Sequence, residues 1–99
     1  MKHEKSPCVY IMTNAHNTVL YTGVTSNLAT RLAQHRGNPG VGFSARYRTK
    51  KLVYVEALED MEQAILREKQ IKGGSRQKKL DLINLLNPEW KDLSEEHLD

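Results

Sequence analysis

Two short apolar runs, each carrying one tyrosine, constrain most strongly what this chain of 99 residues can fold into. Residues 7–13 and 18–24 are rich in β-branched and aromatic residues, and the polar letters NAHN lie between them. Polar turn formers between two such runs predict a β-hairpin. Tyr10 and Tyr21 lie inside these runs. Apolar side chains alone would be enough to form such strands, so the two hydroxyl groups require an explanation.

The rest of the chain continues this hairpin with helices and one more strand. Caps and periodicity predict three helices. The first begins at Ser26 or Asn27 and ends at about Arg36, the second follows Asp60 over about 61–72, and the third follows Ser75 over 76–86. A third strand is predicted over residues 51–58. The order β-β-α-β-α-α predicts an α+β fold, in which a three-stranded antiparallel sheet is flanked by three helices. We expect one domain over residues 1–99, with a core at 7–86 and an acidic tail at 88–99. This tail is expected to be partly frayed, with Trp90 as the residue that can hold it on the body of the domain.

The composition is that of a globular protein, with 38% hydrophobic and 27% charged residues. No segment approaches the roughly 20 apolar residues of a membrane span, and the charged N-terminus predicts no secretory signal. A single cysteine, Cys8, excludes an internal disulfide and fits a reducing, cytoplasmic location. Because it lies in an apolar run, Cys8 is expected to be a small buried hydrophobe.

The net charge of +3 conceals two strongly basic blocks. Residues 31–51 hold six cations and no acid, and residues 67–79 hold six cations and one acid, Glu68. The first block contains an aperiodic, glycine-containing loop. Two such blocks indicate a surface that meets nucleic acid, and a solvated surface is the alternative. The residues expected to lie along a nucleic-acid backbone are Arg36, Arg46, Arg48, Lys50, Lys51 and Lys72.

Glu68 is a carboxylate on the apolar stripe of the helix predicted over 61–72. At about 100° per residue this stripe is formed by Met61, Ala64, Ile65 and Ile71. Glu68 projects between Ala64 and Ile65, where an unpaired charge would cost several kcal/mol of desolvation. Two explanations remain open. Glu68 pairs with a cation of the same helix (Lys72, Arg67 or Lys69), or it holds a divalent metal ion.

The first predicted helix carries a second polar anomaly. Leu28 and Leu32 form its apolar line, and His35 falls on that line with Arg31 beside it. Because Arg31 and His35 are four residues apart, they share one face and can converge on one ligand. A guanidinium that holds phosphate oxygens and an imidazole that moves a proton suit a phosphodiester. An ordinary surface pair is the alternative.

The tyrosines also have two explanations. Each can pack with its hydroxyl reaching solvent at the sheet edge, as we expect of Tyr47 and Tyr54. Alternatively, five polar residues point toward one end of the sheet, namely Tyr10, Tyr21, Arg31, His35 and Glu68. In that case the chain has a proton acceptor, a phosphate clamp and a metal ligand, which are the parts of a phosphodiester hydrolase. One carboxylate and scattered histidines do not predict a zinc site.

With these residues in view, the sequence resembles the GIY-YIG nuclease family. Residues 8–10 (CVY) stand where that family has Gly-Ile-Tyr, and residues 21–23 (YTG) where it has Tyr-Ile-Gly. Arg31 and Glu68 follow in the expected order. The resemblance covers about residues 7–86 and is closest to small single-domain members similar to the N-terminal nuclease domain of the bacterial excinuclease incision subunit. The departures are Cys8 for glycine and Thr22 for isoleucine.

The resemblance implies a GIY-YIG-like fold and metal-dependent cleavage of DNA, with branched or damaged DNA, as in DNA repair, among the candidate substrates. It implies no small-molecule cofactor and no membrane partner. Glu68 would hold one Mg²⁺ or Mn²⁺ ion. Tyr21 would be the general base or its relay, with Tyr10 in support. Arg31 would stabilise charge on the phosphate, and His35 would assist as a base. An asparagine of the family's active site could correspond to Asn84 or Asn87, and the substrate preference and oligomeric state are not legible from the sequence.

Two rival interpretations remain beside the endonuclease. One is a non-catalytic nucleic-acid-binding module with the same fold, and the other is an α+β domain whose polar residues are paired locally. Glu68 favours the enzyme over the module, because binding a polyanion gains nothing from a carboxylate.

Overall fold

The computed structural model describes residues 6–37 and 51–97, and the side chains of residues 35–37 lie outside that description. Its elements, in chain order, are β1 (Cys8–Thr13), β2 (Leu20–Thr25), α1 (Leu28–Gly37), β3 (Lys51–Ala57), α3 (Met61–Gly73), α4 (Arg76–Leu86) and a short 3-10 helix, η1 (Ser94–Glu96). The predicted order β-β-α-β-α-α and the three-stranded antiparallel sheet are confirmed.

The sheet has the order β2-β1-β3, so that β1 is the central strand. It pairs antiparallel with β2 from Cys8↔Thr25 to Thr13↔Leu20, and antiparallel with β3 on its other side. The hairpin turn is fixed by Asn14, whose Oδ1 accepts from the backbone N–H of Thr18 at 2.8 Å and of Val19 at 3.0 Å. Because β1 has neighbours on both sides and side chains packed on both faces, all six of its residues are buried.

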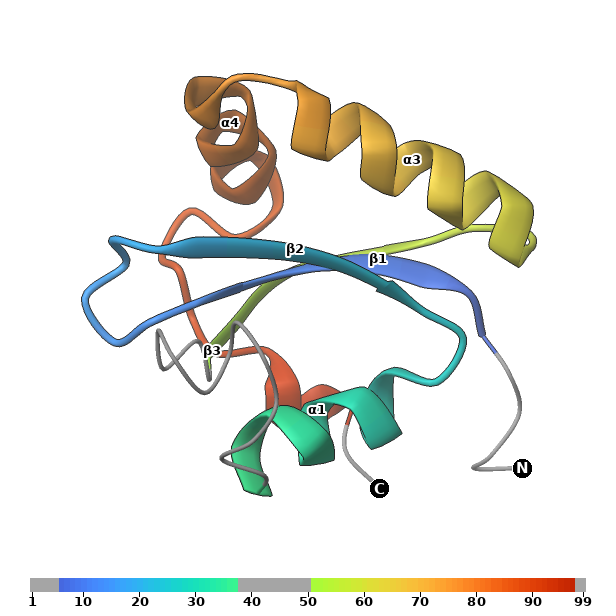
Figure 1. The fold of residues 1–99 in the computed structure, drawn as a ribbon. Helices are drawn as coiled ribbons and strands as arrows, with labels where there is room; N and C mark the ends of the chain where they lie inside the picture. The colour runs from blue at the N-terminus through green and yellow to red at the C-terminus, as the bar shows by residue number, and fades with distance from the viewer. Residues whose placement is uncertain (1–5, 38–50, 98–99) are drawn as a thin grey trace.

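Two hydrophobic clusters cover the two faces of the sheet. Val9 and Ile11 of β1 pack with α3 and α4, whereas Tyr10 and Met12 pack with Leu28 and Leu32 of α1. This alternation follows from the period of two along a strand. Figure 1 shows α3 and α4 on one side of the sheet and α1 on the other. We refer to these sides as the α3/α4 face and the α1 face.

The helix caps are the predicted ones. Asn27 accepts from the N–H of Thr30, Asp60 from that of Gln63 and Ser75 from that of Lys78, at 3.1, 2.8 and 3.2 Å. Each oxygen satisfies one of the N–H groups that an α-helix leaves without an internal partner in its first turn. Among residues 6–37 and 51–97, no helix has the length and apolarity to cross a membrane.

The apolar stripe predicted for α3 is wrong at one position. Ala64 and Ile71 are buried at 0% and 4% exposure, but Ile65 is 39% exposed. The helix turns the edge formed by Ala64 and Ile71 toward the sheet, and Ile65 lies about 100° around the axis from Ala64. The buried stripe is therefore narrower than predicted, because the sequence does not show which edge of the helix faces the sheet.

The prediction for Tyr54 is also wrong, because its hydroxyl does not reach solvent. Tyr54 is 3% exposed, and its hydroxyl donates to Glu56 at 2.6 Å. Burial, followed by this bond and the charge of Glu56, raises the pKa of Tyr54 to about 12. Tyr47 lies outside the described residues.

The segment after α4 is packed on the body of the domain over residues 88–97, which confirms the predicted contact of Trp90, whereas the expected partial fraying is not found in these residues. The N–H of Leu93 donates to the carbonyl of Leu52 at 2.8 Å, and Asp92 accepts from the N–H of Leu52 at 3.1 Å. Ser94 is fully buried. Trp90 packs against the core of the α3/α4 face, and its indole N–H donates to Asn84 at 2.7 Å.

Asn87 connects this segment to the sheet. Its buried amide nitrogen donates to the carbonyls of Val53 and Lys91 at 3.1 and 2.9 Å, and its Oδ1 accepts from the N–H of Lys91 at 3.1 Å. These bonds give both Asn84 and Asn87 structural partners at the end of α4.

We predict that Asn87→Ala lowers the free energy of unfolding by about 2–3 kcal/mol, because it leaves buried backbone groups without partners. Asn84→Ala is the matched control and should cost about 1 kcal/mol or less, since its single bond is exposed. Urea unfolding followed by circular dichroism measures both. Equal losses in the two variants would contradict the structural role of Asn87.

Candidate active site

Tyr10 and Tyr21 form a pair on the α1 face. Tyr10 stands opposite Gly23 and Tyr21 opposite Met12, so that the two tyrosines are diagonal neighbours on adjacent strands. Their ring centroids are 6.3 Å apart and the ring planes are inclined by 53°. The hairpin register alone thus brings together two rings that are far apart along the chain.

The two phenols of this pair have different surroundings. Tyr10 is fully buried, whereas Tyr21 is only half-buried. Burial raises the pKa of Tyr10 well above its ordinary value, the charge of Tyr21 and a hydrogen bond with Tyr21 raise it further, and the charge of Arg31 opposes them. Tyr10 therefore keeps its proton and is suited to donate a hydrogen bond, whereas Tyr21 is the phenol that solvent can reach.

Gly23 is required by the ring of Tyr10. A Cβ atom at position 23 would lie 2.5 Å from both the Cζ and the hydroxyl oxygen of Tyr10, and contacts this short do not occur without displacement of an atom. The glycine of one tripeptide therefore makes room for the tyrosine of the other. This dependence was missed from the sequence, although both residues belong to the matched tripeptides.

Arg31 enters the same region from α1. The helix is held on the sheet by Leu28 and Leu32, at 9% and 0% exposure. The half-buried Arg31 lies near enough for its charge to lower the pKa of Tyr10 in part. His35 is one turn further along α1, and its side chain, like that of Arg36, lies outside the described residues. The role of His35 stays a prediction.

Glu68 comes to the sheet from the other side. It belongs to α3, whose Ala64 and Ile71 pack on the α3/α4 face, whereas the tyrosines lie on the α1 face. Because β2 is an edge strand and α3 packs along it, Glu68 and the tyrosines can share a ligand only around that edge. The structure brings Tyr10, Tyr21 and Arg31 together, and it holds Glu68 on a separate element.

The carboxylate of Glu68 has a local partner. Its Oε2 lies 2.8 Å from Nζ of Lys72, and the two side chains are 14% and 52% exposed. This is the local ion pair that the sequence left open as one explanation. Because Glu68 is largely buried, loss of Lys72 would leave its carboxylate poorly solvated, so another cation would have to take the place of the lysine.

The other predicted nucleic-acid contacts are described in part. Lys51 is half-buried at the start of β3, and Lys72 is exposed on α3. Arg46, Arg48 and Lys50 lie outside the described residues. The second basic block, residues 67–79, forms parts of α3 and α4.

Comparison with known proteins adds family evidence to this geometry. The family model of the GIY-YIG catalytic domain matches residues 6–81. The chain belongs to the GIY-YIG catalytic domain family. This is a family of nuclease type, which indicates nucleic acid as the class of substrate.

The chain is also similar to UPF0213 proteins of comparable length. A UPF0213 protein of Staphylococcus haemolyticus is 40% identical over 76% of this chain and 90% of its own, and a UPF0213 protein of Syntrophus aciditrophicus is 42% identical over 82% and 92%. The solution NMR structure of a UPF0213 protein of Bacillus halodurans covers 95% of this chain and 99% of its own, with a TM-score of 0.57 and 24% identity. That likeness supports the fold.

The two departures from the GIY-YIG tripeptides have different consequences. Cys8 is 4% exposed, and burial raises its pKa to about 11, so that it packs as a small apolar residue, as predicted. Thr22 is 4% exposed. It lies two residues from both Leu20 and Val24 along β2, so all three side chains are on the α3/α4 face. Its hydroxyl has no hydrogen-bond partner within residues 6–37 and 51–97.

We predict that Gly23→Ala destabilises the domain by about 1–3 kcal/mol, because the new methyl group displaces the buried ring of Tyr10. Gly73→Ala is the control, since a Cβ at position 73 meets no atom within 4 Å. Because alanine has a higher helix propensity than glycine, this variant should be as stable as the wild type or slightly more stable. Urea unfolding measures both changes. An undiminished stability of Gly23→Ala would show that the ring does not depend on the glycine.

Thr22→Val should stabilise the domain by about 1 kcal/mol, because it replaces an unsatisfied buried hydroxyl with a methyl group of similar shape. Thr25 on the same strand provides the matched control. Its hydroxyl accepts from the N–H of Asn27 at 3.0 Å, so Thr25→Val should cost about 1 kcal/mol. Thermal unfolding should move in opposite directions for the two variants, and a loss of stability in Thr22→Val would mean that its hydroxyl is satisfied in solution.

Proposed function

We propose that this protein is an endonuclease that hydrolyses DNA phosphodiester bonds with the help of one Mg²⁺ or Mn²⁺ ion. The observation that carries the proposal is the pair of unlike phenols beside Arg31, in a chain of the GIY-YIG catalytic domain family. A purely structural tyrosine pair needs no nearby guanidinium and no half-exposed member.

In this proposal Tyr21 accepts the proton of the attacking water. The buried Tyr10 keeps its own proton, and its hydrogen bond with Tyr21 would hold the phenol of Tyr21 in place for the proton transfer. The water oxygen bonds to phosphorus as the bond from phosphorus to the sugar oxygen breaks, and that oxygen takes a proton from solvent. His35, one turn from Arg31, would assist this proton transfer.

Arg31 would hold the phosphate. A guanidinium donates two parallel hydrogen bonds to phosphate oxygens and stabilises the charge that develops on them. Because α1 is fixed by two buried leucines, Arg31 starts from a rigid element. Rigid placement reduces the entropy lost on binding.

Glu68 is the residue that would hold the metal ion. Within the described residues, no three His, Cys, Asp or Glu side chains gather to form a complete protein site. Mg²⁺ accepts such a sparse set, because it is often bound by one or two carboxylates and completes its coordination with water and substrate phosphate. The ion would supply charge neutralisation at the phosphate. We infer that Lys72 moves from Glu68 to a phosphate of the DNA and so frees the carboxylate.

A non-catalytic nucleic-acid-binding module is the second candidate. The ion pair between Glu68 and Lys72 favours it, because a satisfied carboxylate needs no metal. In either case the basic residues Arg36, Arg46, Arg48, Lys50 and Lys51 would contact the backbone, and binding should weaken steeply with added salt.

Cleavage of supercoiled plasmid in the presence of Mg²⁺ tests the proposal. We expect Tyr21→Phe and Glu68→Gln each to lower the cleavage rate by about 100-fold or more, since each removes a group used in the reaction. Glu62→Gln is the matched control, an exposed glutamate on the same helix, and should cleave at the wild-type rate. Urea unfolding shows whether each variant is folded.

Wild-type protein that shifts DNA in a gel but cuts it with neither Mg²⁺ nor Mn²⁺ would support the binding module. If Glu68→Gln unfolds the domain, Glu68 is half of a structural ion pair. In that case Tyr21→Phe, which leaves the ion pair intact, decides the question.

A further inference from the structure

A cavity of about 320 Å³ lies between α3 and α4, away from the tyrosine pair. Its walls include three apolar side chains, Ile71, Leu82 and Leu85, and three cations, Arg67, Lys78 and Lys79. All six belong to helices that cover the α3/α4 face, on the opposite side of the sheet from α1 (Figure 1). We refer to this cavity as the α3–α4 groove. The proposed cleavage reaction makes no use of it.

The apolar wall of the α3–α4 groove runs from the buried Ile71 through the half-buried Leu82 to Leu85, which is open to solvent. Leu85 is 77% exposed and its neighbour Leu86 is 65% exposed, although the core of this face is otherwise well buried. A cavity near 300 Å³ is at the small end of sites that enclose a ligand, and it has room for one or two apolar side chains. Exposed leucines beside a cavity are typical of a surface that is covered by a partner.

One rim of the α3–α4 groove carries net positive charge. Lys78 and Lys79 lie in the first turn of α4, which holds no acidic residue. Within the described residues neither lysine is in an ion pair, although Nζ of Lys79 donates to the carbonyl of Gly74 at 3.5 Å. Asp81, which also lines the groove and accepts a bond from Gln77, offsets one of the two charges. Two lysines at the positive end of a helix repel its dipole, so a carboxylate of a partner would be attracted there.

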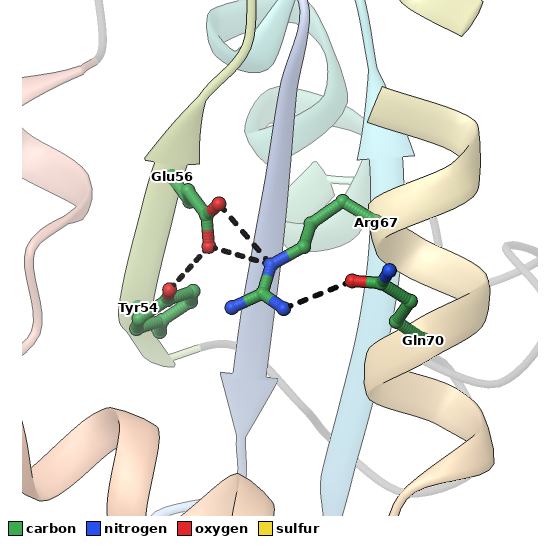
Figure 2. A network of polar contacts seen from close by, with 4 residues as sticks. All are labelled: Tyr54, Glu56, Arg67 and Gln70. Carbon is green, nitrogen blue, oxygen red and sulfur yellow. Dashed lines mark hydrogen bonds and ion pairs between the residues drawn. The ribbon is translucent and has the colours of Figure 1, made fainter. Parts of the chain in front are cut away.

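Arg67 shapes the opposite wall rather than adding net charge. Its Nε donates to both carboxylate oxygens of Glu56 at 3.0 and 3.1 Å, and its Nη1 donates to Gln70 at 3.2 Å. Figure 2 shows this network, in which the hydroxyl of Tyr54 also reaches Glu56. Because the guanidinium is held on two sides, this wall of the groove is preformed.

We propose that the α3–α4 groove binds an acidic segment of a partner protein, which inserts one leucine, isoleucine or phenylalanine side chain between Leu82 and Leu85 and places carboxylates on Lys78 and Lys79. The lining of the groove contains no aromatic ring on which a nucleobase would stack. A peptide with an apolar anchor and acidic flanks therefore matches its walls better than single-stranded nucleic acid does. Because the groove and the tyrosine pair lie on opposite faces, a bound partner would leave the tyrosine pair open.

A phage-displayed library of random peptides of about twelve residues, a length that fills a groove of this kind, is the first probe. Full-length wild-type protein should enrich peptides that combine acidic residues with an aliphatic or aromatic anchor. Amide shifts in the ¹⁵N spectrum on titration of an enriched peptide should gather at Ile71, Gly74, Leu82 and Leu85.

Matched variants then distinguish peptide binding in the α3–α4 groove from nonspecific peptide binding elsewhere on the surface. Leu85→Ser and Lys78→Glu should each weaken peptide binding by about tenfold or more. Leu66→Ser and Lys69→Glu change an exposed leucine and an exposed lysine of α3 that do not line the groove, and should weaken it less than about twofold. Plasmid cleavage by Leu85→Ser should stay at the wild-type rate, so the outcome does not depend on the proposed nuclease function.

Three results would overturn the proposal. The selection could yield no peptide whose binding is weakened by Leu85→Ser, or the enriched peptides could lack acidic residues. The third such result is that the amide shifts fall on another face of the domain. An oligothymidine that displaces the peptide and shifts the same amides would instead assign the groove to nucleic acid.

Discussion

The packing of the Tyr10 ring against the backbone of Gly23 is the contact on which the site depends. It joins the central strand to an edge strand at a place where any side chain on the neighbour would collide with the ring. The register that follows sets Tyr21 diagonally beside Tyr10. A buried phenol that keeps its proton and a half-exposed phenol therefore stand next to each other, and neither position would survive a slip of the hairpin by one residue.

The sheet divides the molecule into two faces with different chemistry. The α1 face holds the tyrosine pair and Arg31, whereas the α3/α4 face holds the larger aliphatic core and the groove with its basic rim. Glu68 belongs to α3 and is already paired with Lys72. For the proposed reaction it must serve a site that it reaches around the edge of β2. The exchange of Lys72 between Glu68 and a phosphate is a simple way to couple DNA binding to metal binding.

Local signals in the sequence were sufficient for most of the fold. The caps at Asn27, Asp60 and Ser75 act as expected, because a side-chain oxygen satisfies free N–H groups wherever the helix finally lies. The exposure of Ile65 and the bond of Tyr54 to Glu56 were not predictable. They depend on which edge of α3 meets the sheet and on Arg67, which belongs to another element and lies eleven residues from Glu56.

The sequence by itself determined the order of the elements, the hairpin, the family tripeptides and the residues available for chemistry, because turns, caps and periodicity are set by neighbours along the chain. Only the tertiary structure decided that Tyr10 is the fully buried member of the pair, that Glu68 approaches from the other face, and that Leu85 borders a groove. Burial and pairing arise from elements that meet in space, and no local pattern records which side of the sheet each helix will cover.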